Sequence, residues 1–271
     1  MSLETIKKYH IWAKKSLWQN FLVDEKKVQE IADTLSISWK NIIEVGPWYG
    51  ALTERLLIQE PQWLHLVELD TDMISVLNER KSLWELMLWN VDFQIFHQDV
   101  LQFVPGFQNY SVVANIPYYI TSPILRHFLY DIAHSPQEML ILMQQDVGDK
   151  ILGKWKNKSS VLSLMIEKKC RVEEKILVPK ECFFPQPKIE SSVLYFQTHH
   201  DFDEIDDANF LAFIKKWFLA PRKKLIKNLT FGGYDRNKIE QFFQENNFSE
   251  NIRGEDMNIS EWIQLMIFLG L

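Results

Sequence analysis

The stretch "IIEVGPWYGALTE", Ile42 to Glu54, places a tryptophan inside a turn that should be rich in glycine. A short apolar run with strand character leads into a Gly-Pro turn, and a helix is expected to begin near Ala51. Strand, turn and helix in this order are typical of a nucleotide-binding unit. Its turn uses glycine because the backbone must approach the ligand closely and adopt dihedral angles that a side chain disfavours. Trp48 is therefore expected either to project into the ligand crevice or to strain the turn.

Short β-like runs alternate with amphipathic segments over the first two hundred residues. This alternation predicts an α/β fold, a mostly parallel sheet with helices on both faces. After Phe196 only helical spacing remains, so we expect an α/β domain over 1–200 and a small all-helical domain over 201–271. The predicted strands are 41–45, 64–69, 93–96, 111–114 and 139–143, followed by "KILV" and "SSVLYF".

Composition limits the class of protein. A chain of 271 residues with 46% apolar residues is long enough for a large packed core. It has no apolar run long enough to span a membrane, and its lysine-containing start lacks the apolar centre of a secretory signal, so we expect a cytoplasmic protein. Cys170 and Cys182 are too few and too far apart for a zinc site, and buried free thiols are expected.

Charge is distributed unevenly along the chain. The net charge of −6 argues against a protein that coats nucleic acid indiscriminately. Lysines nevertheless gather in three basic runs, and acidic residues gather over 201–207. Each basic run is either a solvated face or part of one groove for nucleic acid. The basic runs are "KKYHIWAKK" (7–15), "KILGKWKNK" (150–158) and "RKKLIK" (222–227).

Acidic residues stand at the ends of three predicted strands. In an open α/β sheet, ligands bind beyond the carboxyl ends of the strands, so Glu44 with Gly46, Glu68 and Asp99 should converge on one crevice. Glu68 lies about twenty residues after the glycine turn, a position that suits the hydroxyls of a ribose. Asp99 suits the amino group of an adenine. The alternative is that Glu68 and Asp99 only cap helices.

The segment "ANIPYYITSP", Ala114 to Pro123, follows the fourth predicted strand. It brings an amide side chain, a rigid carbonyl group and an aromatic face to the same crevice. These groups match the needs of a planar aminopurine, namely acceptors for its exocyclic hydrogens and a surface for stacking. The alternative is a proline turn with tyrosines in the core.

Seven motifs together resemble those of the ribosomal RNA adenine N6-dimethyltransferases, in the same order and at similar spacing over nearly the whole chain. The most similar branch is the bacterial small-subunit enzyme, which uses S-adenosylmethionine to dimethylate two adjacent adenosines near the 3' end of 16S rRNA. The resemblance implies a Rossmann-like methyltransferase domain over 1–200 and a helical RNA-binding domain over 201–271. It also implies a monomer that acts on the small ribosomal subunit, without a metal or a membrane. The motifs are "KKSLWQNFL", "IIEVGPWYGALTE", "VELD", "QDVL", "NIPYYITSP", "VPKECFFPQPKIESSV" and "PRKKLIKNL".

The resemblance also implies roles for individual residues. The amino group of the target adenine would donate to Asn115 and to a carbonyl of Ile116 or Pro117, which hold it in line for methyl transfer. Tyr118 and Phe183 would lie on the two faces of that adenine. The residues expected to contact the cofactor are Asn20, Leu22, Gly46, Glu68, Asp99 and Asn115.

Three positions within these motifs depart from the family pattern: Trp18 and Trp48 replace glycines, and Tyr119 replaces an asparagine. Three explanations stay open for Trp48. The chain is an inactive RNA-binding homologue, or its loop has moved, or the codon UGA is read as glycine in the living organism. The composition favours the last, because 9 glycines and 10 tryptophans are the reverse of ordinary usage. Trp155 also falls on a family glycine, whereas Trp262 fits an apolar helix face. A second enzymatic possibility is the related 23S rRNA methylase of the antibiotic-resistance type.

Overall fold

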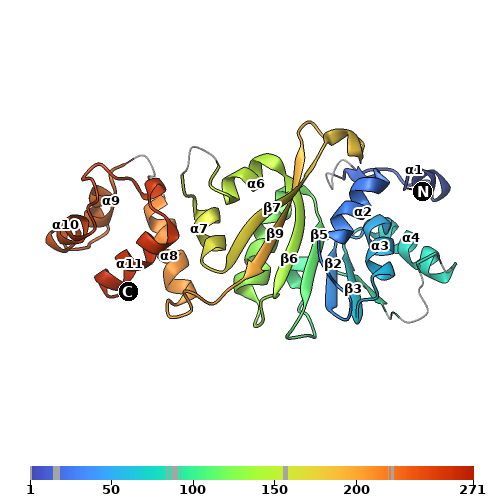
Figure 1. The fold of residues 1–271 in the computed structure, drawn as a ribbon, viewed down its shortest axis with the longest axis horizontal. Coiled ribbons are helices and arrows are strands. Elements are labelled where there is room, and N and C mark those ends of the chain that lie inside the picture. The colour runs from blue at the N-terminus through green and yellow to red at the C-terminus, as the bar shows by residue number, and fades with distance from the viewer. Residues whose placement is uncertain are drawn as a thin grey trace. The chain divides into compact units, whose positions relative to one another are not determined.

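The computed structural model describes residues 2–14, 19–83, 85–86, 91, 93–154, 158–218, 220 and 223–271 (Figure 1). The chain forms two compact units, one from residues 1–148 and 172–198, the other from residues 149–171 and 199–271. The sequence predicts a division at residue 200, and the structure differs in one segment, because residues 149–171 pack with the C-terminal helices.

Seven strands of the described chain form one sheet, in the order β4-β3-β2-β5-β6-β9-β7. The strands from β4 to β6 are parallel to their neighbours, and β9 is antiparallel to β6. Helices lie on both faces, as Figure 1 shows, so the predicted α/β sheet is confirmed. The bounds are β2 Asn41–Val45, β3 Trp63–Glu68, β4 Phe93–His97, β5 Ser111–Asn115, β6 Glu138–Gln144, β7 Cys170–Val178 and β9 Ser191–Thr198.

Two helices of the first unit begin at a side-chain cap. Asp24 and Asp70 accept backbone N–H groups at the starts of α2 and α4, which satisfies donors that the first turn leaves free. Helix α3 begins at Ala51, as predicted. The helices are α1 Ser2–Lys8, α2 Glu25–Asp33, α3 Ala51–Ile58, α4 Thr71–Ser82 and α5 Thr121–Arg126, with the π-helical segment η4 His127–Asp131 and the short 3-10 turns η2 Val100–Gln102, η3 Tyr118–Ile120 and η5 Lys180–Cys182. Helix α6, Gln145–Ile151, crosses the boundary between the two units.

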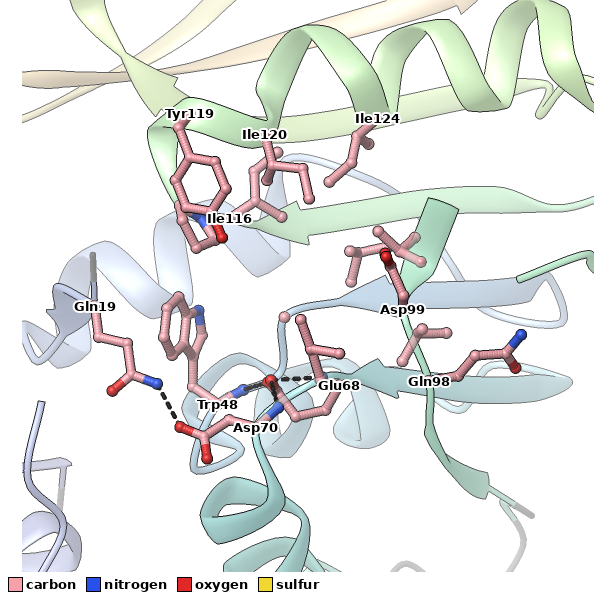
Figure 2. Close-up of a pocket in the computed structure, with 16 residues that line it drawn as sticks. Gln19, Trp48, Glu68, Asp70, Gln98, Asp99, Ile116, Tyr119, Ile120 and Ile124 are labelled. Carbon is pink, nitrogen blue, oxygen red and sulfur yellow. Dashed lines mark hydrogen bonds between the residues drawn. The ribbon is translucent and has the colours of Figure 1, made fainter. Parts of the chain in front are cut away.

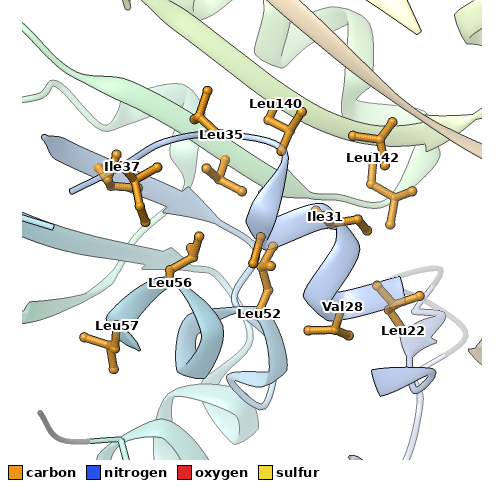
Figure 3. Close-up of a cluster of buried hydrophobic side chains, with 14 of the residues drawn as sticks. Leu22, Val28, Ile31, Leu35, Ile37, Leu52, Leu56, Leu57, Leu140 and Leu142 are labelled. Atoms are coloured by element: carbon orange, nitrogen blue, oxygen red, sulfur yellow. The ribbon is translucent and has the colours of Figure 1, made fainter. Parts of the chain in front are cut away.

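A buried apolar cluster joins α2 and α3 to the sheet (Figure 3). Its helical members are spaced three or four residues apart, so they share one helix face. Burial of this face fixes α3, and with it the turn that follows β2, against the strand ends. The cluster includes Val28, Ile31, Leu52, Leu56, Leu140 and Leu142.

One small element escapes sequence prediction. Strand β1 (Phe21–Leu22) pairs antiparallel with β8 (Phe183–Phe184) as a separate two-stranded sheet. Two residues are too few to show the alternation that predicts a strand. The pair fastens the N-terminal segment to a loop that is distant in sequence.

The second unit is helical, as expected for the C-terminal residues. Its described helices surround aromatic residues, and the rings of Phe213 and Trp262 lie 5.7 Å apart in an edge-to-face arrangement. Trp262 is fully buried, which confirms it as an apolar core residue. The helices are α7 Val161–Glu167, α8 Asp207–Phe218, α9 Leu225–Phe231, α10 Arg236–Glu245 and α11 Ile259–Leu269, with the turn η6 Gly254–Asp256.

Two expectations from the composition concern the cysteines and membrane-spanning helices. Cys170 and Cys182 are both buried free thiols, as predicted. Among the described residues, none of the helices has the length and apolar character needed to span a membrane.

Candidate active site

The turn after β2 has the backbone of a glycine-rich loop. Gly46 has φ +68°, Trp48 has φ +55° and Gly50 has φ +87°, all in the left-handed region that favours glycine. A Cβ atom at Gly46 would lie 2.7 Å from the carbonyl oxygen of Asn115. Glycine is therefore required at 46, and Trp48 adopts a conformation that costs a non-glycine residue about 1–2 kcal/mol.

The Trp48 side chain lies inside the crevice, with only 6% of the residue exposed. Its indole Nε1 donates to the carbonyl oxygen of Asn115 at 2.5 Å, and its ring packs edge-on against Phe21 at 5.4 Å. Both expected consequences of a tryptophan therefore occur, since the side chain enters the crevice and the backbone is left-handed.

The crevice is a cavity of about 70 Å³ at the carboxyl ends of the parallel strands (Figure 2). The ends of β2 and β3 and the segments after β4 and β5 contribute to it. Gly46, Glu68 and Asp99 therefore converge as predicted, whereas Glu44 is not part of this lining. Its lining includes four of the predicted site residues, Gly46, Glu68, Asp99 and Pro117, together with Trp48.

Glu68 and Asp99 each bind backbone N–H groups. The Glu68 carboxylate accepts from the N–H groups of Leu69 at 2.8 Å, Asp70 at 2.9 Å and Trp48 at 3.2 Å. Desolvation raises the pKa of this buried carboxyl, whereas the three N–H groups oppose the rise. The Asp99 side chain caps the turn η2 by accepting from Leu101 at 3.0 Å. Both carboxylates thus line the cavity and also cap or order the local backbone.

The other predicted site residues are not all in the cavity lining. Asn115 ends β5 and lines a smaller adjoining cavity that also contains Leu22, Gly46 and Trp48. Asn20 is partly buried. The side chain of Tyr118 and the whole of Trp18 and Trp155 lie outside the described residues.

Phe183, which the resemblance places against the target base, is buried in the apolar cluster and only 5% exposed. It pairs with Leu22 in the small sheet, whereas the adjacent Phe184 is 50% exposed. Phe183 therefore packs in the core of the first unit.

We expect Phe183→Ala to lower the free energy of unfolding by about 3–5 kcal/mol, because it leaves a cavity in this cluster. Phe184→Ala is the matched control and should change it by about 0.5 kcal/mol or less. Urea unfolding of both variants measures the difference. Equal stability of the two would contradict the packing role of Phe183.

Four polar residues of the cavity lining were not among the site residues predicted from the sequence: Gln19, Asp70, Gln98 and Tyr119. The Gln19 amide donates to Asp70 at 2.7 Å, and Lys14 donates to the same carboxylate at 2.5 Å. These bonds fasten the N-terminal segment beside the cavity (Figure 2). The signal in the sequence was Asp70 itself, which lies two residues after Glu68 at a strand end and caps the start of α4.

Glu44 is the residue before the last of β2 and is almost fully buried. Thr53 donates to one of its carboxyl oxygens at 2.6 Å. Burial raises the pKa of Glu44 from its usual value of 4.5 to about 8, and the negative charge of Glu68 adds to the rise. Near neutral pH the folded protein therefore holds Glu44 as a neutral acid.

This shift predicts a pH-dependent stability. Between about pH 5 and 8 the unfolded chain loses the Glu44 proton while the folded chain keeps it, so stability falls by up to about 1.4 kcal/mol per pH unit. Relative to the parent, Glu44→Gln should gain stability as pH rises through this range and then level off. Chemical unfolding of both proteins at several pH values tests this, and a difference that does not change with pH would contradict it.

Comparisons with known proteins assign the chain to a protein family. The family model "Ribosomal RNA adenine dimethylase" matches residues 12–269. The chain belongs to this family. It is 33% identical to the ribosomal RNA small subunit methyltransferase A of Mycoplasma mobile, over 91% of this chain and 94% of the relative. It is also 33% identical to the enzyme of that name from Aliarcobacter butzleri, over 93% of this chain and 94% of the relative.

Solved structures show the same fold. The 23S rRNA methyltransferase ErmE matches with a TM-score of 0.74 at 21% identity, covering 93% of this chain and all of that one. A dimethyladenosine transferase from Plasmodium falciparum matches with a TM-score of 0.76 at 19% identity, covering 92% and 97%. The Rossmann-like methyltransferase fold predicted from the sequence is confirmed. As a family member, the chain is an S-adenosylmethionine-dependent rRNA adenine dimethyltransferase.

The residues around the cavity fit S-adenosylmethionine except at one position. Two acidic residues at strand ends and a left-handed turn suit a nucleoside and a close backbone approach. The remaining space of about 70 Å³ is too small, because pockets for such ligands hold about 300–1,000 Å³. The Trp48 indole occupies the cavity, so the chain as written does not fit the cofactor.

The three basic runs have different environments. Lys8 of the first run is paired with Glu85, and Lys14 with Asp70 and Asp72. In the second run, Lys158 is paired with Glu255 and Asp256. In the third run, three lysines line a groove within the helical unit and have no ion-pair partner among the described residues. They are Lys223, Lys224 and Lys227.

Proposed function

We propose that this enzyme dimethylates N6 of two adjacent adenosines near the 3' end of 16S rRNA in the small ribosomal subunit. The observation that carries the proposal is the match, over more than 90% of the chain, to relatives named small subunit methyltransferase A. The alternative substrate is 23S rRNA, the substrate named for ErmE, but its 21% identity supports only the fold.

The proposed base site lies at the end of β5. Asn115 and the carbonyl groups of Ile116 and Pro117 would accept the amino hydrogens of the target adenine. Tyr118 and Phe183 would provide aromatic faces for a base that has left its stack. On the cofactor side, Glu68 and Asp99 would accept hydrogen bonds, and S-adenosylmethionine supplies the methyl group when it is bound.

We also propose that the functional protein carries glycine at position 48. The left-handed backbone, the indole inside the cavity and the small remaining volume all support this. Trp39 supports it independently, because it has φ +60° and is 79% exposed, a combination that suits glycine and gives an indole nothing to pack against. Reading UGA as glycine would explain both positions.

The experiment that tests the function is methyl transfer from labelled cofactor to immature small subunits. The Trp48→Gly variant and the unaltered protein are compared, with large subunits as the control substrate. Label in two adjacent adenosines of 16S rRNA from the glycine variant is the expected result. Label in 23S rRNA alone would instead favour the alternative enzyme.

The third basic run makes a separable prediction about RNA binding by the proposed RNA-binding domain, 201–271. Reversing Lys223 and Lys224 to Glu should weaken binding to small subunits and reduce its dependence on salt, because fewer counterions are released. Cofactor affinity should not change, since both lysines belong to the other compact unit. Filter binding at several salt concentrations measures the first effect and calorimetry the second. An unchanged salt dependence would identify this run as a solvated face.

We further propose that the enzyme acts in the cytoplasm as a monomer without a metal. Size-exclusion chromatography with light scattering, in the presence and absence of a chelator, tests the last two points. A stable dimer, or activity lost to the chelator, would contradict them.

A further inference from the structure

A groove of about 860 Å³ runs along the helical unit beside the end of α8 and the length of α9. We call it the lysine groove and define it by Lys216, Lys223, Lys224, Lys227 and Phe231. Its volume is large enough for a ligand the size of a nucleotide or more. The methyltransferase cavity belongs to the other compact unit, so the lysine groove is a separate site.

The charge of the groove is positive although the chain carries −6 overall. No carboxylate is present among its described lining residues. Two residues of the acidic run in the same unit are paired with cations outside the groove: Asp201 with Arg171 at 2.9 Å, and Asp207 with Lys168 at 2.5 Å. Among described residues the lysines of the groove form no ion pair, so their charge is available to a polyanion.

The wall of the groove is closely packed. A Cβ atom at Gly232 would lie 1.9 Å from the ring of Trp217, so only glycine lets the end of α9 approach this ring. Trp217 is 3% exposed. Lys216 Nζ donates to the carbonyl oxygen of Gly232 at 3.1 Å and lies 5.0 Å from the centre of the Trp217 ring. This lysine is therefore held in place before any ligand arrives.

Phe231 is the most unusual residue of the groove. It ends α9 and is 96% exposed, so it contributes almost nothing to the core. An exposed aromatic ring beside several cations is the combination that binds unpaired nucleic acid, where the cations contact phosphates and the ring stacks on a base. A duplex offers no free base face, because its bases are already stacked on one another.

We propose that the lysine groove binds an unpaired stretch of rRNA, with phosphates on the lysines and one base stacked on Phe231. The proposal rests on the proposed function for its ligand, and it adds a nucleotide-binding site in a different compact unit from the methyltransferase cavity. The stacked base would make the helical unit prefer single-stranded RNA over other polyanions.

The test uses the full chain and fluorescence anisotropy with labelled single-stranded oligoadenylate, compared with the same strand paired to oligouridylate. We expect the single strand to bind more tightly. Phe231→Ala should weaken its binding by about tenfold without changing the salt dependence, and Phe231→Trp should restore it. Lys227→Ala should reduce the slope of log affinity against log salt by about 0.7.

Matched controls come from the same unit. Lys215 adjoins Lys216 but is outside the groove lining, and Ile267 is a 56% exposed apolar residue of α11. Lys215→Ala and Ile267→Ala should each leave single-strand affinity within about twofold. Because Phe231 is exposed, its variants should keep the parent's unfolding temperature.

Equal affinity for the duplex, or an unchanged affinity in Phe231→Ala, would overturn the proposal, as would equal competition by an acidic peptide of the same charge. Methyl transfer to small subunits by the Trp48→Gly variant is measured in a separate assay from RNA binding. A variant that methylates 16S rRNA but shows no effect of Phe231 would refute only the groove, whereas absence of methyl transfer would refute the proposed function.

Discussion

Calorimetry on the Trp48→Gly variant is expected to show S-adenosylmethionine binding at least about 100-fold tighter than that of the unaltered chain, a gain of about 2.7 kcal/mol. The substitution empties the part of the cavity that the indole fills and frees the Asn115 carbonyl group from its hydrogen bond to Nε1. It also relieves the left-handed strain at 48. Glu68 and Asp99 already line the cavity, so no further change is needed for their contacts.

Trp39→Gly is the matched control, since it makes the same substitution at another left-handed position. Trp39 is 79% exposed, so its replacement should stabilise the fold by about 1 kcal/mol through relief of strain and leave cofactor affinity unchanged. Trp48→Gly should instead cost about 2 kcal/mol or more in the free protein, because a buried side chain is lost. Tight cofactor binding by the unaltered chain would refute the steric argument. If neither Trp48→Gly nor the double variant with Trp18→Gly binds, the enzyme assignment is wrong for this chain.

The origin of these tryptophans can be tested without any binding assay. If UGA is read as glycine, the codons for Trp39 and Trp48 are UGA and peptides from the source organism carry glycine there. Trp262, fully buried in the helical unit, should be encoded by UGG. UGG at 39 and 48 would refute recoding, and the calorimetry would then distinguish an inactive homologue from an enzyme with a moved loop.

The sheet was predictable because its strands are buried on both faces. Ile42 and Ile43 are both fully buried on adjacent positions of β2, and such continuous apolar runs are typical of parallel strands. The division at residue 200 was less accurate. Residues 149–171 join the C-terminal helices through tertiary contacts, such as Lys168 with Asp207, that leave no local signal in the sequence.

Part of the site followed from topology alone. Glu68, Asp99 and Gly46 converge because parallel strands bring their carboxyl ends to one edge of the sheet. Gln19 is held at the cavity by its bond to Asp70, across 51 residues of sequence, and no local pattern could reveal this contact. Runs of like charge were also an incomplete guide, because two of the three basic runs hold lysines that are paired with carboxylates within the protein.

The second large effect concerns Asn115. In the Trp48→Gly background, Asn115→Ala should lower the rate of methyl transfer by about 100-fold, the usual loss when one preorganised polar group at a reacting centre is removed. Asn115 ends β5 in register with Leu142 of β6, and its carbonyl oxygen faces Gly46, so its backbone is held by the sheet and the turn together. Replacement by alanine keeps this backbone and removes only the amide acceptor.

Asn109→Ala supplies the control, because Asn109 is an exposed asparagine shortly before the same strand and should leave the rate unchanged. Single-turnover rates at saturating cofactor separate the chemical step from binding. A large fall in rate with a stable fold would place the target amino group at the end of β5. A rate within about threefold of the parent would mean that another group positions the adenine, because an acceptor of the reacting amino group cannot be removed without slowing its methylation.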